Sequence, residues 1–110
     1  MELPNRDKAW IPAPKLTDYL LNESHPVGGA KARFFRAHGF NDLNVSLLEQ
    51  DLLEIAHTGT VDEVETIKHG VKYAINGSPD TPSGRIVLVR TVWFIPHGAT
   101  DPQFITTYPM

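Results

Sequence analysis

The chain has 110 residues, of which 41% are hydrophobic and 21% are charged, and its formal net charge is −3 at pH 7. This length and composition are typical of one globular domain with a modest core, and they argue against intrinsic disorder. The absence of cysteine excludes disulfide frameworks, thiolate zinc sites and cysteine nucleophiles. The first ten residues carry four charges and no apolar run, so we expect no signal peptide, no membrane span and a cytoplasmic, soluble protein.

The charges are unevenly distributed along the chain. Residues 1–40 hold six Lys or Arg against four Asp or Glu, whereas residues 41–70 hold one against seven and residues 71–110 hold three against two. An acidic middle argues against a protein that coats long nucleic acid duplexes. It remains compatible with a compact anion site elsewhere in the fold.

Three helices are predicted in the first half of the chain. Pro14 suits the first turn of a helix that runs to Leu21 with one apolar side. A second helix is expected from Pro26 or Gly29 to His38, with Gly39 as a left-handed cap. The third helix follows Asn41-Asp42, has leucines on one face and ends at Thr58.

The pattern changes from helical to extended after residue 60. Strands are expected at 61–68, 71–75, 85–95 and 103–108, and the first carries exposed acidic residues typical of an edge strand. The long β-branched and aromatic run at 85–95 belongs in the centre of a sheet.

Helices followed by strands predict an α+β fold, in which the N-terminal helices pack on one face of a four-stranded antiparallel meander. We expect a single domain over residues 1–110, with a helical part at about 14–58 and a sheet part at about 61–108.

The segment HPVGGAKARFF, residues 25–35, combines a helix start with glycines, a histidine and cations. Gly28 and Gly29 allow a close backbone approach, and the early amides of the helix together with Lys31 favour a bound phosphate. His25 adds a side chain that titrates near neutrality. The alternative is structural: His25 caps a loop, Gly29 lets two segments pack, and the cations are solvated.

The central strand carries one polar residue on each of its faces. Arg90 requires either a carboxylate or a solvent-filled groove, and a structural pair with Glu63 or Glu65 competes with a role in catalysis. Thr91 and Trp93 share the other face, where a hydroxyl and a flat ring suit phosphate and base binding, although both also suit a buried strand.

The last strand adds further hydroxyl groups. Thr106 and Tyr108 share one face of it, and this edge is expected to adjoin Thr91. The five histidines lack the spacing of metal ligands, so no metal site is predicted.

The segments HPVGGAKARFF, GVKYAINGS, TPSGR, VRTVWFI and FITTYP resemble a small bacterial domain family of uncharacterised function, over residues 15–109. The order of helices and strands is similar to that of the barnase, EndoU, colicin D and RelE superfamily of ribonucleases, many of which are toxins. In members similar to colicin D, a Lys and a His from the helical part face a Ser/Thr-x-Trp on a strand. Lys31, His25, Thr91 and Trp93 occupy the corresponding positions.

The resemblance implies a toxin-type endoribonuclease that needs no metal or cofactor and cleaves RNA, with tRNA as a candidate, by attack of the 2′-OH on the adjacent phosphate. His25 would be the acid or the base, Lys31 and Arg90 would stabilise the phosphorane, and Thr91 would position a phosphate oxygen. The substrate-binding residues would be Gly28, Gly29, Trp93, Thr106 and Tyr108. A cognate antitoxin or immunity protein would be the protein partner.

Two other functions are open from the residues alone. One is a noncatalytic antitoxin-like or immunity-like domain that presents the acidic segment 42–65 to a basic partner. The other is a nucleotide-binding or anion-binding domain that uses the Gly28-Gly29 helix start without chemistry.

Overall fold

A computed structural model describes all of residues 1–110, with the helical segments before the sheet. A short 3-10 turn, η1, spans Arg6–Lys8, and α1 spans only Ala13–Lys15 before the π-helical turn η2 at Leu16–Leu20. The longer helices are α2 at Gly29–Ala37 and α3 at Val45–Thr58. No helix combines the length and the hydrophobicity needed to cross a bilayer.

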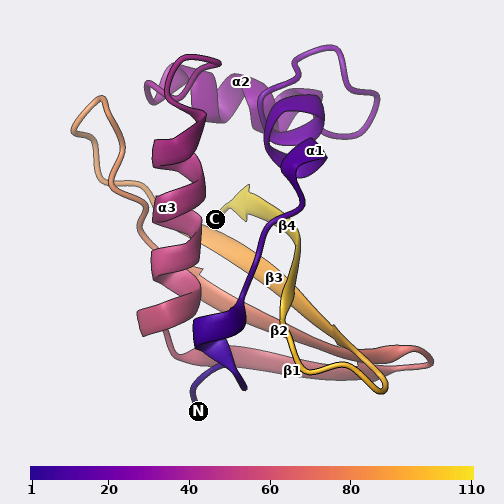
Figure 1. Ribbon diagram of the computed structural model, residues 1–110. Helices are drawn as coiled ribbons and strands as arrows, with labels where there is room; N and C mark the ends of the chain where they lie inside the picture. Colours follow the sequence, from indigo (N-terminus) through magenta and orange to yellow (C-terminus); the bar gives the residue numbers. More distant parts are fainter.

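Four strands form an antiparallel meander in the order β1-β2-β3-β4. They are β1 (Val61–Ile67), β2 (Gly70–Gly77), β3 (Val89–Pro96) and β4 (Gln103–Pro109). The helices lie on one side of this sheet, with α3 beside it and α1 and α2 near the end of β4 (Figure 1). The predicted α+β architecture is therefore confirmed.

Most predicted bounds agree with the structure to within two residues, but one helix differs in type and one strand begins later than predicted. The helix expected over 14–21 keeps one α-helical turn and then widens, because the Leu21 amide donates to the Leu16 carbonyl five residues earlier. The strand expected over 85–95 begins at Val89, where its partners on both sides run out: Val89 pairs with Gly77 of β2 and Pro109 of β4. Gly39, by contrast, has the predicted left-handed backbone, with φ of 98°.

The core lies between α3, the N-terminal segments and the inner face of the sheet. Trp93 on β3 is fully buried and meets Phe104 on β4 edge to face at 5.4 Å. The buried cluster comprises Leu3, Ile11, Leu16, Leu20, Leu21, Phe35, Phe40, Leu48, Leu52, Ile55, Ala56, Ile75, Val89, Trp93 and Phe104.

The first ten residues contact both outer strands of the sheet. The Val61 amide at the start of β1 donates to the Met1 carbonyl at 2.7 Å. At the other edge, the Trp10 amide donates to Pro102 and the Trp10 carbonyl accepts from Phe104 at 2.9 Å. The N-terminal segment thus occupies part of the hydrogen-bonding edge of β4 and fixes the backbone on both sides of Gln103.

Candidate functional site

Three polar side chains from distant parts of the chain meet beside the β4 edge. The Lys31 ammonium, on α2, donates to Tyr19 Oη at 2.5 Å and to Thr106 Oγ1 at 2.8 Å. The two hydroxyls are themselves 2.9 Å apart, so the three groups form a closed triangle. Because one member comes from η2, one from α2 and one from β4, the triangle exists only in the folded chain.

The triangle carries positive charge that no carboxylate pairs with. Lys31 makes no ion pair in the structure, and Lys15 lies over the same Tyr19 ring with Nζ 5.0 Å from its centroid. Burial acts to raise the pKa of Tyr19, but hydrogen bonds with Lys31 and Thr106 and the charges of Lys31 and Lys15 outweigh it. The pKa of Tyr19 is therefore lowered from its ordinary value of about 10.

His25 stands next to the triangle in the loop before α2. Its ring meets the Tyr19 ring edge on at 5.1 Å, and its Nδ1 accepts hydrogen bonds from the amides of Val27 at 3.0 Å and Gly28 at 2.9 Å. A nitrogen that accepts two amide protons carries none itself, so the neutral ring holds its proton on Nε2. His25 therefore offers Nε2–H as its free polar group.

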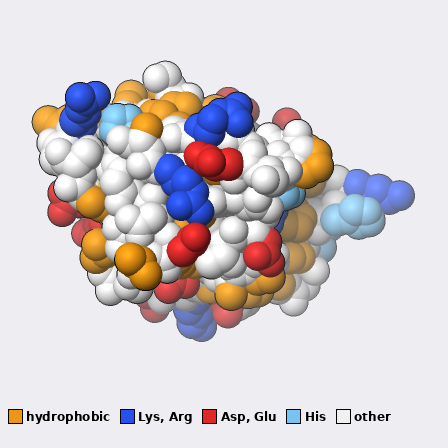
Figure 2. Space-filling model, turned by 90° about the horizontal axis from the view of Figure 1, so that it is seen from above, with side chains coloured by type: hydrophobic (Ala, Val, Ile, Leu, Met, Phe, Trp, Pro, Cys, Tyr) orange, Lys and Arg blue, Asp and Glu red, His pale blue; other side chains and the backbone are white.

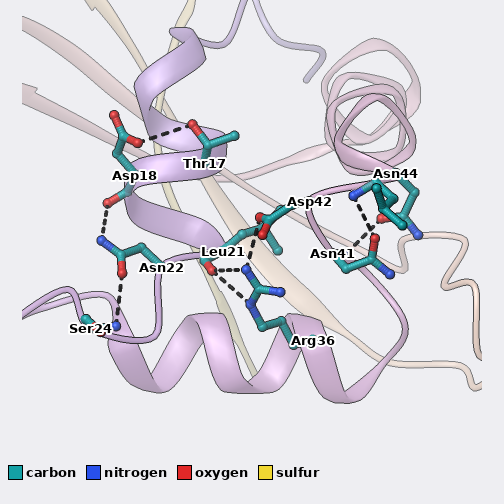
Figure 3. Close-up of polar contacts among 10 residues, drawn as sticks. Thr17, Asp18, Leu21, Asn22, Ser24, Arg36, Asn41, Asp42 and Asn44 are labelled. Carbon is teal, nitrogen blue, oxygen red and sulfur yellow. Dashed lines mark hydrogen bonds and ion pairs between the residues drawn. The ribbon is translucent and has the colours of Figure 1, made fainter.

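The loop that carries His25 is held in place by α2. Arg36 donates from Nε at 2.9 Å and from Nη2 at 2.7 Å to the Leu21 carbonyl, and Nη2 also reaches Asp42 at 3.0 Å (Figure 3). Asn22, at the start of the loop, donates to Asp18 and accepts from the Ser24 amide. These bonds connect α2 with the end of η2 and hold the start of the loop that carries His25.

The triangle forms one wall of a groove of about 690 Å³. Its lining combines cations and hydroxyls with prolines and aliphatic side chains. The lining residues are Pro12, Pro14, Lys15, Asp18, Tyr19, His25, Val27, Lys31, Gln103, Ile105 and Thr106. On the upper face of the molecule, Lys and Arg side chains are scattered among acidic and uncharged ones rather than gathered in one basic patch (Figure 2).

The structure thus brings together His25, Lys31 and Thr106, which the sequence identified, and adds Tyr19. Tyr19 lies within the helix predicted to run from Pro14 to Leu21, one side of which is apolar. Its phenol group could have indicated a role beyond the core. A Tyr on the apolar side of a helix needs a polar partner for its Oη.

The expectation of an accessible Thr91 and Trp93 is wrong. Both side chains are fully buried, and they bond to each other: Trp93 Nε1 donates to Thr91 Oγ1 at 2.9 Å, and Thr91 donates to the Ile75 carbonyl at 2.8 Å. They lie on the face of β3 that the helices cover, where neither RNA base nor phosphate can reach them.

Arg90 also lies outside the groove. It projects from the uncovered face of the sheet and pairs with Asp62 at 2.8 Å and Glu63 at 3.0 Å, and these bonds raise its pKa. Arg90 therefore forms the structural ion pair with Glu63 that competed with a catalytic role, and Asp62 is an additional partner. Tyr108, opposite Arg90 in the register, keeps its ring 5.9 Å from Lys31 Nζ and so lies at the border of the site.

Gly28 and Gly29 serve packing rather than phosphate binding. The amides of both residues are occupied by His25, through Nδ1 and the carbonyl respectively. A Cβ at Gly28 would lie 2.7 Å from the Tyr19 ring, and one at Gly29 would lie 2.6 Å from the Glu23 carbonyl. The amides of the two glycines are therefore not free to bind a phosphate, and the glycines let the loop close on Tyr19.

We expect Gly28→Ala to destabilise the protein by about 1–3 kcal/mol. Gly28 has φ of −89°, so alanine brings no backbone strain, and the cost comes from the contact with Tyr19. Urea unfolding monitored by circular dichroism measures the change. A stabilisation of about 0.4–1 kcal/mol, the usual effect of Gly→Ala at a permissive site, would contradict this packing role.

A second titratable group lies on α3, away from the groove. Asp51 has a buried Oδ2 with no hydrogen-bond partner, beside a small hollow that also contains Asp80. Burial, and to a lesser extent the charge of Asp80, raise the pKa of Asp51 to about 6. The folded state therefore disfavours the ionised carboxylate.

Asp51 should make stability fall as the pH rises from about 4 to about 6. The unfolded chain ionises at its usual pKa of about 3.9, whereas the folded protein resists ionisation until about pH 6. We expect Asp51→Asn to stabilise the protein by about 1 kcal/mol at pH 7, allowing for solvent screening, and to have little effect below pH 4. Thermal unfolding at both pH values measures this, with Glu54→Gln on the same helix as control. Equal effects of Asp51→Asn at both pH values would refute it.

Comparisons with known proteins support the fold and define the family. No curated protein matches the chain. A chain of the contact-dependent growth inhibition toxin–immunity protein complex from Klebsiella pneumoniae 342 is similar in structure, with a TM-score of 0.75 and 19% sequence identity over 94% of this chain and 95% of that chain. At this identity the similarity shows a shared fold. The profile of a domain family of unknown function, DUF6883, matches residues 2–110, and the chain therefore belongs to that family.

Proposed function

We propose that the protein is a toxin-type ribonuclease that cleaves RNA without a metal ion in the groove beside Tyr19, Lys31 and Thr106. The observation that carries this proposal is the unpaired Lys31 ammonium, which donates to two hydroxyls at the wall of an open groove, next to His25. A cation without a carboxylate partner favours an anionic ligand. Phosphate chemistry also needs a base and an acid, and this cluster contains both.

The cleavage step balances with Tyr19 and Lys31 alone. With Tyr19 ionised and Lys31 protonated, the Tyr19 oxygen takes the proton of the 2′-OH, and the 2′ oxygen bonds to the adjacent phosphorus. The bond from phosphorus to the 5′ oxygen breaks, and the 5′ oxygen takes a proton from Lys31. The products are a 2′,3′-cyclic phosphate and a 5′-OH end, and the hydrogen bond between Lys31 and Tyr19 returns the proton from phenol to amine.

His25 and Thr106 have supporting roles in this scheme. The Nε2–H of His25 donates to a nonbridging phosphate oxygen, which stabilises the negative charge of the phosphorane. Thr106 bonds to both Tyr19 and Lys31 and fixes their positions. It thus takes the positioning role that was expected of Thr91. Arg90 has no part in the step, because Asp62 and Glu63 already neutralise it.

The shared fold with a chain of a toxin–immunity complex supports this proposal. It agrees with the resemblance of the sequence to ribonuclease toxins, and it supports a protein partner. A cognate immunity protein is the partner expected for such a toxin.

The test is cleavage of total tRNA and of a short mixed-sequence RNA by the purified protein, with and without a chelator. We expect chelator-resistant cleavage whose rate rises with pH and levels off below about pH 10, because the pKa of Tyr19 is lowered. Tyr19→Phe should lose most activity and the rising limb, while Tyr73→Phe on β2 serves as control. Absence of cleavage at micromolar protein would overturn the proposal.

An immunity-like domain is the second candidate. It is favoured by the exposed acidic side chains of β1, among them Asp62, Glu63 and Glu65, since such a strand complements a basic partner. The similar structure is a complex of toxin and immunity protein, so both roles are compatible with it. Tight binding to a basic toxin domain without RNA cleavage would favour this candidate.

A further inference from the structure

The groove that contains the Lys31 triangle is also lined by apolar side chains. Pro12 and Pro14, which follow the Trp10 segment, and Ile105 on β4 form what we call its apolar end. Such a surface accepts a flat, weakly polar ring rather than a second charged group. The groove thus combines a cationic end with an apolar end.

Gln103 is the polar group of the apolar end. It lines the groove, it is partly exposed, and its side-chain amide makes no hydrogen bond within the protein. The Trp10 segment fixes its backbone through hydrogen bonds at Pro102 and Phe104. A free amide on a fixed backbone offers a donor and an acceptor side by side at a set position.

The spacing of the two ends matches a nucleotide. Gln103 and Thr106 are three residues apart on β4, and a bulge at Ile105 places them opposite Phe94 and Val92, which share one face of β3. The two residues are therefore within about 10 Å of each other, and Thr106 holds the Lys31 ammonium. We propose that the groove binds one nucleoside monophosphate unit, with its phosphate at Lys31, its base against Pro12, Pro14 and Ile105, and its base edge read by Gln103. This deepens the proposed function by naming the residue that selects the base.

The amide of Gln103 can distinguish bases because each base edge presents its own order of donors and acceptors. A site built to bond a base edge rejects a base that leaves the amide unpaired. The apolar walls supply affinity for any base, so Gln103 should affect preference much more than overall binding.

The test measures binding of the four ribonucleoside 3′-monophosphates and of inorganic phosphate by calorimetry, which needs no cleavage. We expect the best nucleotide to bind at least about tenfold more tightly than phosphate, and about tenfold more tightly than the worst nucleotide. Gln103→Leu should remove the preference among bases without weakening phosphate binding. Lys31→Met should weaken all five ligands, and Gln50→Leu, on the exposed side of α3, should change nothing.

Equal affinity for phosphate and all nucleotides would overturn the inference, as would a preference that persists in Gln103→Leu. Absence of nucleotide binding would overturn it as well. Selective nucleotide binding by a protein that does not cleave RNA would instead overturn the ribonuclease proposal and leave this one standing, so the two failures are distinguishable.

Discussion

Lys31→Met is expected to lower the rate of RNA cleavage by about 10²- to 10⁴-fold, the range for loss of a general acid that also stabilises charge. The substitution removes the donor of two hydrogen bonds and the unpaired charge of the triangle while keeping most of the side chain's length. Lys31 is only partly buried, so the fold should persist. Single-turnover cleavage of a defined RNA measures the rate, and circular dichroism checks the fold.

Lys68→Met is the matched control, because Lys68 is exposed in the turn between β1 and β2 and takes no part in the groove. Its cleavage rate should stay within about twofold of the parent protein, since it contacts no reacting group. If Lys31→Met also stayed within that range while the parent protein cleaved RNA, the chemistry would have to lie elsewhere in the molecule.

Trp93→Ala is expected to destabilise the protein by about 3–5 kcal/mol. The indole is fully buried, packs against Phe104 and donates to Thr91, so truncation leaves a large cavity and removes this hydrogen bond. Because small domains are stable by only about 5–15 kcal/mol, such a loss leaves little margin. Urea unfolding measures it.

Trp10→Ala is the matched control, because the Trp10 side chain is 47% exposed. This substitution should lower the free energy of unfolding by about 1 kcal/mol or less. Thr91→Val keeps the protein testable if Trp93→Ala does not fold: it should cost about 1–3 kcal/mol through the unpaired indole N–H. Thr91→Val should also leave the cleavage rate unchanged. A large loss of cleavage in a stably folded Thr91→Val protein would restore the phosphate-binding role that we reject.

The fold followed from the sequence because its signals are local. The apolar stripe of residues 45–58 and the alternation in the four strands set the type and order of the elements, and Gly39 marked the end of α2. The bounds that failed depend on tertiary partners. Residues 85–88 have strand composition, but β2 ends at Gly77, opposite Val89, and of these four residues only Leu88 accepts a backbone hydrogen bond from beyond β4, from Met110.

The site was predictable only in part, because alternation along a strand separates its two faces without showing which face is covered. Thr91 and Trp93 were correctly placed on one face of β3, and that face proved to be the core. Arg90 was correctly placed on the other, where carboxylates from β1 reach it. Tyr19 joins Lys31 through a widened helical turn, a feature that residue spacing alone does not reveal.

The attachment of the first ten residues to both outer strands has a consequence for how the protein folds. Met1 bonds to the start of β1, whereas Trp10 bonds to residues 102 and 104, at the far end of the chain. During synthesis, about 90 further residues must follow Trp10 before its partners exist, and contacts so distant in sequence form slowly. Until Trp10 bonds to residues 102 and 104, the backbone around Gln103 has no fixed position. The end of the groove that we propose to bind the base should therefore be among the last parts of the molecule to form.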